Sequence, residues 1–150
     1  MDSHKVNPII VSKNITASPE RIWKAITDVS EMNLWFFNNI PDFKAEIGFK
    51  TWFIVSNDDR KFYHLWEVIS VEKNVSIHVE WTYPGFVKEP FLVVFSLKSE
   101  KINLTNFRVT AYGIEKFLHF NLPEFTVESC KGGWEFFTDN LKKYIEGSIN

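Results

Sequence analysis

The feature that most constrains the fold is a long region, from about Phe43 to Tyr112, in which apolar residues recur at every second position. Its clearest segment is VSIHVEWTY, Val75–Tyr83, where Val, Ile, Val, Trp and Tyr alternate with Ser, His, Glu and Thr. Successive side chains of a strand point to opposite sides of a sheet, so this alternation predicts a strand with one buried and one wet face. Such strands belong in a sheet that is covered on one side.

Six segments are predicted strands. They are Ile9–Ala17, Phe49–Val55, Lys61–Glu72, Val75–Tyr83, Phe91–Lys98 and Asn103–Tyr112. The connections among the last five are short and turn-like, which favours hairpins and an antiparallel sheet. The pattern does not decide whether the Phe49/Phe53 face or the Trp52/Ile54 face of the second segment points inward.

Two short helices are predicted after the first strand. In SPERIWKAITD, Ser18 is a good N-cap, Pro19 suits the first helical position, and the following apolar residues recur at helical spacing. Trp23 lies on that apolar side and is expected to be buried. A second short helix is expected in DVSEMNLWFF, with Asp28 or Ser30 as its cap.

A long helix is predicted from about Thr126 to Gly147. Its apolar stripe consists of Val127, Cys130, Trp134, Phe137, Leu141, Tyr144 and Ile145. Gly132 and Gly133 interrupt it, and each glycine costs roughly 1 kcal/mol in a helix interior. Either they allow a strand or a ligand to approach closely, or the helix bends at this point, or they precede the helix proper. The conformation of Gly113–Phe125 is left undecided by the sequence.

These elements predict one α+β domain over residues 1–150. A curved antiparallel sheet of six or seven strands should wrap around the long C-terminal helix, leaving space near the ends of that helix. The chain contains 15 Phe, 6 Trp and 4 Tyr, 17% of its residues. Aromatic side chains bury about 150–250 Å² each, so most should fill the core while some line a cavity.

Charge and composition exclude several classes of protein. The net charge is −2 and no basic stripe appears, which argues against a nucleic-acid partner. No signal peptide is recognisable, and no apolar run approaches the roughly 18 residues of a membrane span. The single cysteine, Cys130, cannot form an internal disulfide, which fits a reducing compartment. We therefore expect a cytoplasmic protein that does not bind membranes.

Three stretches carry a resemblance to a known family. Asn14–Asp28, NITASPERIWKAITD, has an apolar–x–Ala strand end, a Pro and then Ile–Trp–x–Ala–Ile. Gly133–Leu141 has Gly–Trp–x–x–Phe–x–x–x–Leu, and Leu65–Trp81 is similar to a further family pattern but lacks its Gly. The chain thus resembles the START-like superfamily, also called SRPBCC or helix-grip. Within it, the chain resembles the homologues of the C-terminal domain of the activator of the heat-shock protein 90 ATPase (AHSA-like), over about residues 7 to 147.

The resemblance implies a deep cavity between the sheet and the C-terminal helix, and strand alternation turns the same faces inward. The expected lining residues are His64, Trp66, Trp81, Tyr83, Phe95, Phe107, Trp134, Phe137 and Leu141. An aromatic lining suits a small hydrophobic or aromatic ligand. Binding of such a molecule is the leading functional hypothesis.

Two other functions remain open. One is a cyclase or dehydratase of the kind found in the same superfamily, which would need a polar pair in the cavity. His64 is the best candidate base and Tyr83 a possible acid, provided that both lie on one face of the sheet. The other is a chaperone-interacting module, implied by the family name, although the cochaperone itself carries an additional N-terminal domain.

No catalytic residue, metal site or cofactor is predicted. The four histidines have no partner at zinc-like spacing, and the chain has no nucleophile elbow or glycine-rich phosphate loop. Four aromatic residues are expected to be exposed and favour a homodimer. They are Phe36, Phe37, Phe86 and Phe136.

Overall fold

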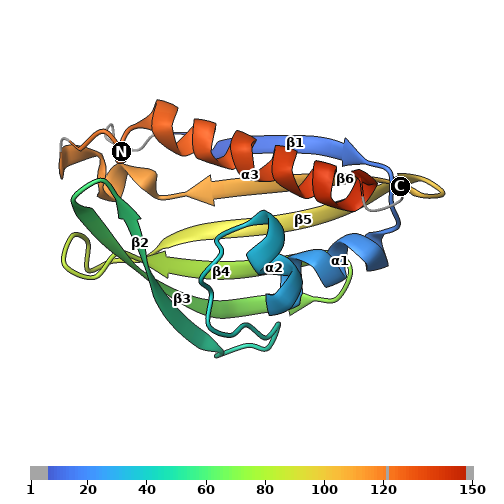
Figure 1. The fold of residues 1–150 in the computed structure, drawn as a ribbon, viewed down its shortest axis with the longest axis horizontal. Helices are drawn as coiled ribbons and strands as arrows, with labels where there is room; N and C mark the ends of the chain where they lie inside the picture. Colours follow the sequence, from blue (N-terminus) through green and yellow to red (C-terminus); the bar gives the residue numbers. More distant parts are fainter. Residues whose placement is uncertain (1–6, 121, 148–150) are drawn as a thin grey trace.

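The computed structural model describes residues 7–120 and 122–147, which form a six-stranded antiparallel sheet with helices on one face (Figure 1). The elements in chain order are β1 (Ile9–Ile15), α1 (Pro19–Thr27), α2 (Val29–Trp35), β2 (Lys50–Asn57), β3 (Arg60–Glu72), β4 (Ser76–Thr82), β5 (Phe91–Lys101), β6 (Leu104–Tyr112), the 3-10 turns η1 (Ile114–Lys116) and η2 (Leu118–Phe120), and α3 (Val127–Gly147). The predicted α+β helix-grip architecture is confirmed.

The strand order in the sheet is β1-β6-β5-β4-β3-β2, so the last five strands form consecutive hairpins and β1 joins the far side by pairing with β6. Three hairpin turns contain a residue with positive φ: Asp58 (54°), Asn74 (66°) and Asn103 (59°). Asn and Asp adopt this left-handed conformation more readily than other non-glycine residues. The short Asn- and Asp-containing connections are therefore the turns that the sequence predicted.

Two register irregularities accompany the curvature of the sheet. One lies between Val68 and Ser70 in β3, and the other lies between Ser99 and Lys101 in β5. Bulges of this kind bend a strand and increase its twist. In Figure 1, α3 runs lengthwise along the β1 and β6 side of the curved sheet, and α1 and α2 lie beside the C-terminal half of α3.

The two short helices begin where the sequence indicated. The Oγ of Ser18 accepts a hydrogen bond from the backbone N–H of Arg21 at 3.2 Å, and α1 opens on Pro19. Asp28 ends α1 and caps α2, because its Oδ1 accepts from the backbone N–H of Ser30 at 2.9 Å. Trp23 is 7% exposed, as predicted.

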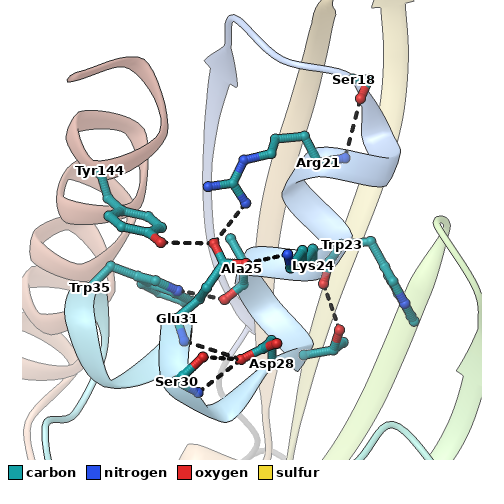
Figure 2. A network of polar contacts seen from close by, with 11 residues as sticks. Ser18, Arg21, Trp23, Lys24, Ala25, Asp28, Ser30, Glu31, Trp35 and Tyr144 are labelled. Carbon is teal, nitrogen blue, oxygen red and sulfur yellow. Dashed lines mark hydrogen bonds and ion pairs between the residues drawn. The ribbon is translucent and has the colours of Figure 1, made fainter. Parts of the chain in front are cut away.

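A carboxylate at the helix junction links α1, α2 and α3, as Figure 2 shows. Glu31 Oε1 accepts hydrogen bonds from Arg21 Nη1 at 2.7 Å and from the Tyr144 hydroxyl at 2.8 Å. The Arg21 guanidinium also lies over the Tyr144 ring, 5.6 Å from its centroid. Nearby, Trp35 Nε1 donates to the Ala25 carbonyl at 2.8 Å. This end of α3 is therefore fixed by partnered polar contacts.

The structure decides which face of β2 points inward. Phe53 is buried in the core, whereas Trp52 is 59% exposed on the opposite face. The Phe49/Phe53 face is therefore the inner one.

The predicted stripe of α3 is partly wrong. Trp134, Leu141 and Ile145 are buried, but Val127 is exposed at the first position of the helix. Thr138, which the apolar pattern missed, is fully buried, and its hydroxyl donates to the Glu135 carbonyl at 3.1 Å. A threonine that satisfies its own hydroxyl in this way packs like an apolar residue.

The two glycines of α3 lie inside the helix, which rules out the alternative that they precede it. A Cβ at either Gly132 or Gly133 would have no protein atom within 4 Å. No strand therefore approaches them closely.

The expectation of four surface aromatics is also wrong for most of them. Phe36 is buried, stacks on Trp35 at 4.8 Å between ring centroids, and meets Phe137 edge-on at 4.7 Å. Phe37 and Phe86 are partly buried against the core, and only Phe136 of the four is exposed, at 61%. Most of the argument for a homodimer is therefore lost.

The segment after β6 contains no strand in its described part, residues 113–120 and 122–125. Gly113 has a φ of 82°, which suits a residue without a Cβ, and turns the chain from β6 into η1. Phe117 and Phe125 from this segment are buried and meet with ring centroids 5.0 Å apart. The segment thus closes one end of the core.

Candidate functional site

A cavity of about 150 Å³ lies beneath the first half of α3. Its floor is the inner face of strands β3 to β6, and its end wall is the segment between β6 and α3. The lining residues are Phe37, His64, Trp81, Tyr83, Phe91, Ala111, Ile114, Phe117, Glu124, Ser129, Cys130, Gly133, Trp134 and Phe137. Aromatic rings make up most of this wall.

The structure places the nine residues expected to line a cavity in three different settings. Those that line this cavity are His64, Trp81, Tyr83, Trp134 and Phe137. Trp66 and Phe95 line a separate small void, which Trp81 also borders. Phe107 and Leu141 are fully buried and line neither space. The alternation of side chains along a strand identifies the residues that point inward, but it does not separate those that fill the core from those that face a void.

Several lining residues were not among those proposed from the sequence. Phe91 shares the parity of Phe95 on β5, so the alternation contained a signal for it. Phe37 and Phe117 lie in irregular segments without periodicity, and no sequence pattern indicated their place. Gly133 was singled out as a helix glycine, and it lines the cavity from α3.

The polar centre of the cavity is the pair His64 and Tyr83. Both lie on the inner face of the sheet, with ring centroids 4.9 Å apart and planes at 78°. His64 Nδ1 lies 3.2 Å from the Phe62 carbonyl oxygen. Because a carbonyl only accepts, this hydrogen bond places the ring hydrogen on Nδ1 and leaves Nε2 as an acceptor.

Burial keeps this pair uncharged at neutral pH. It lowers the pKa of His64 to about 4, so the imidazole is neutral. It also raises the pKa of Tyr83 far above the usual value, so its hydroxyl remains protonated. Burial likewise raises the pKa of the Cys130 thiol to about 11, which makes Cys130 a poor nucleophile at pH 7.

An ion pair ties the end wall of the cavity to the β2–β3 hairpin. Glu124, which lines the cavity, accepts hydrogen bonds from Arg60 Nε at 2.9 Å and from Asn57 Nδ2 at 2.5 Å. Arg60 Nη2 lies 2.8 Å from the same carboxylate. The hydrogen bond from Arg60 holds the pKa of Glu124 below its usual value. This contact fixes the chain just before α3.

A second, smaller void of about 10 Å³ lies deeper in the core. Its walls are Ile26, Met32, Phe36, Phe43, Trp66, Ile77, Val79, Trp81, Val93 and Phe95. Trp81 borders both spaces. The Nε1 of Trp66 is buried and has no hydrogen-bond partner, the one buried side-chain nitrogen or oxygen in this state among the described residues.

Two other kinds of site are not found in the described part of the chain. Within residues 7–120 and 122–147, no three His, Cys, Asp or Glu side chains are grouped so that they would hold a metal ion. In the same residues no helix has the length and apolar character needed to cross a membrane.

Solved structures with the same fold are numerous. A crystal structure of a protein from Mesorhizobium loti is 23% identical, covers 93% of this chain and 96% of its own, and has a TM-score of 0.72. The solution structure of the Aha1 dimer from Colwellia psychrerythraea is 22% identical, covers 92% and 95%, and has a TM-score of 0.68. A crystal structure described as an HSP90 activator from Plasmodium falciparum is 18% identical, covers 95% and 97%, and has a TM-score of 0.70.

No curated protein matches the chain significantly in sequence. The family described as activator of Hsp90 ATPase homolog 1-like protein matches residues 16–146, which is nearly the whole chain and extends from α1 to the last turn of α3. These structural neighbours share the fold of this chain over at least 92% of its length. The chain therefore belongs to the family of activator of Hsp90 ATPase homolog 1-like proteins.

Proposed function

We propose that the protein binds a small, uncharged aromatic molecule in the cavity beneath α3. The observation that carries this proposal is a cavity of about 150 Å³ walled by aromatic rings around one neutral polar pair. An engineered apolar cavity of roughly this volume in another protein takes up benzene. A ligand with one aromatic ring therefore matches the available space.

The polar pair indicates which substituents such a ligand would carry. The Nε2 of His64 is a neutral acceptor, and the Tyr83 hydroxyl can donate or accept. A ligand with one hydroxyl or amide group would satisfy them. A carboxylate ligand is disfavoured, because the Glu124 carboxylate lines the same space and a buried charge without a partner is costly.

Thermal unfolding in the presence of phenol, 4-ethylphenol or benzoate tests the proposal. A ligand at 100 times its Kd adds about 2.7 kcal/mol to stability. For a chain of this length, that corresponds to a rise in Tm of roughly 5–10 °C. The two phenols should raise Tm and benzoate should not. If no neutral aromatic compound stabilises the folded protein, the proposal is wrong.

A pair of variants controls for the location of binding. Gly133→Leu places a side chain in the cavity, whereas Gly132→Leu adds the same side chain at an exposed position of α3 outside the cavity lining. Binding of 4-ethylphenol should be lost in Gly133→Leu and kept in Gly132→Leu.

A cyclase or dehydratase activity has less support than ligand binding. His64 and Tyr83 do share one face of the sheet, which was its geometric condition. However, a base with a pKa of about 4 has little tendency to take a proton at pH 7, and the Tyr83 hydroxyl is a weaker acid than usual. These shifts favour binding over acid–base catalysis.

A chaperone-interacting module is the second candidate, because the matching family is named after an activator of the Hsp90 ATPase. Retention on immobilised heat-shock protein 90 and a change in its ATPase rate would support it, and the absence of both would remove it. A cytoplasmic location remains a prediction. A homodimer now rests mainly on Phe136, and light scattering of a Phe136→Ser variant would test it.

A further inference from the structure

The indole N–H of Trp66 is buried and lacks a hydrogen-bond acceptor, unlike every other buried side-chain nitrogen or oxygen in residues 7–120 and 122–147. Trp66 is 2% exposed, and no acceptor is available to its Nε1. The buried Trp35 shows the usual solution, since its Nε1 donates to the Ala25 carbonyl at 2.8 Å. A buried donor without a partner destabilises a folded protein, and such groups are uncommon.

A buried water does not account for the Trp66 donor. The void that Trp66 borders has a volume of about 10 Å³, close to the space that one water requires. Buried waters usually make two to four hydrogen bonds, whereas the side chains around this void are almost entirely apolar. A water there would gain one good bond and lose the others.

The position of Trp66 connects it to the larger cavity. His64 and Trp66 are two residues apart on β3 and share its inner face, so they are separated by about 7 Å along the strand. Trp81 lies opposite Trp66 in the β3–β4 pairing, with ring centroids 4.9 Å apart, and it borders both spaces. Trp81 is the one residue common to the two linings, so a ligand that reaches Trp66 from the larger cavity has to displace its ring.

We propose that Trp66 is a ligand-binding residue whose N–H receives a hydrogen-bond acceptor from the molecule held in the cavity. This inference rests on the proposed function and narrows its ligand class. The ligand is a flat, uncharged ring compound with a hydroxyl or N–H group for His64 and Tyr83 at one end. It also carries a carbonyl or ether oxygen for Trp66, which lies two residues beyond His64 on β3.

Two probes of similar shape test this assignment. 4-Hydroxyacetophenone and 4-ethylphenol both carry the hydroxyl, but only the ketone carries the acceptor. A hydrogen bond to a buried donor contributes enough to make the ketone bind about tenfold more tightly to the wild type. The same comparison in Trp66→Phe, which removes the donor and keeps a ring, should show a ratio about tenfold smaller.

The ratio of the two affinities in each protein is the quantity to compare. The hydroxyl of the ketone is more acidic than that of 4-ethylphenol, but this difference enters the ratio in both proteins and cancels when the ratios are compared. Any loosening of the core in Trp66→Phe affects the binding of both probes and cancels within the ratio for that variant. Indole N–H resonances in ¹H–¹⁵N spectra give a second readout. The Trp66 resonance, assigned through its contact with the Phe53 ring, should move downfield with the ketone only. This readout needs no variant, so it holds even if Trp66→Phe does not fold.

The outcomes separate the two proposals. If both probes bind with the same ratio in wild type and variant, and the Trp66 resonance does not move with the ketone, the role of Trp66 is refuted and the cavity proposal stands. If neither probe binds the folded wild type, both proposals are overturned. A tenfold change in ratio together with the downfield shift establishes the acceptor subsite.

Discussion

The burial of His64 makes the stability of the fold depend on pH in a window that can be calculated. The pKa of His64 is about 4 in the folded protein and 6.5 for an ordinary histidine. Between these values the unfolded chain binds a proton on the imidazole that the folded protein does not bind. Stability therefore falls as pH falls from 6.5 towards 4. The loss from this residue should be about 2 kcal/mol at pH 5 and about 3 kcal/mol at pH 4.

Urea unfolding at pH 7 and pH 5 measures this loss. His64→Phe keeps a ring beside Phe53 and Phe37 but cannot bind a proton. Its loss of stability between the two pH values should be about 2 kcal/mol smaller than that of the wild type. The control is His78→Gln, on the opposite face of its strand from the buried residues, which should retain the full loss because His64 is intact.

The result that would refute this reasoning is an equal loss in wild type and His64→Phe. It would mean that water or a counter-charge reaches the His64 imidazole in the folded protein. The cavity would then not contain the neutral His64 on which the proposed ligand class depends.

Three further predictions concern α3, α1 and the end wall of the cavity. Gly133→Ala and Gly132→Ala should each stabilise by up to about 1 kcal/mol, raising Tm by roughly 2–4 °C, because neither new Cβ meets a protein atom; a lower Tm would reveal a contact that the structure does not contain. Trp23→Ala should lose about 3–5 kcal/mol in urea unfolding, and a loss under 1 kcal/mol would show that its burial contributes little. The lowered pKa of Glu124 stabilises the fold above pH 4.5, and this contribution is lost as pH falls further. Glu124→Gln should therefore flatten the acid side of the stability profile. By removing the charge that holds Arg60, it should also speed the release of 4-ethylphenol in stopped-flow measurements; an unchanged release rate would contradict the second effect.

The regular parts of the fold were predictable because their signals are local. Strand alternation, turn residues and the Ser18 and Asp28 caps each depend on a few neighbouring residues. The exposed Val127 shows the limit of this reasoning, because helical periodicity gives the direction of a side chain but not where the helix lies over the sheet. Thr138 shows a second limit, since an apolar pattern does not count a threonine whose hydroxyl is satisfied within its own helix.

The candidate site was less predictable because it forms between elements. The alternation of side chains along the strands correctly predicted that His64, Trp81 and Tyr83 point inward. It made the same prediction for Phe107, which is fully packed in the core and does not face the cavity. The end wall of the cavity consists of irregular chain that is fixed by the contact between Glu124 and the β2–β3 hairpin, more than sixty residues away in sequence. No periodic pattern encodes such a contact. Burial of Phe36, just after α2, escaped prediction for the same reason.

The pairing of β1 with β6 has a consequence for the newly synthesised chain. Ile9 pairs with Ala111, so β1 is made long before its partner. At 5–20 residues per second, a ribosome adds the intervening hundred residues in roughly 5–20 seconds. During that interval the hairpins from β2 to β5 can form while α3, which covers their aromatic side, has not yet been made. The nascent chain therefore exposes an aromatic, aggregation-prone surface until α3 has been synthesised. A circular permutant that begins at β2 and carries β1 after α3 would bring β1 out at the end, together with the helix against which it packs. Because α3 and β1 run in the same direction, the linker of this permutant has to return along the length of α3.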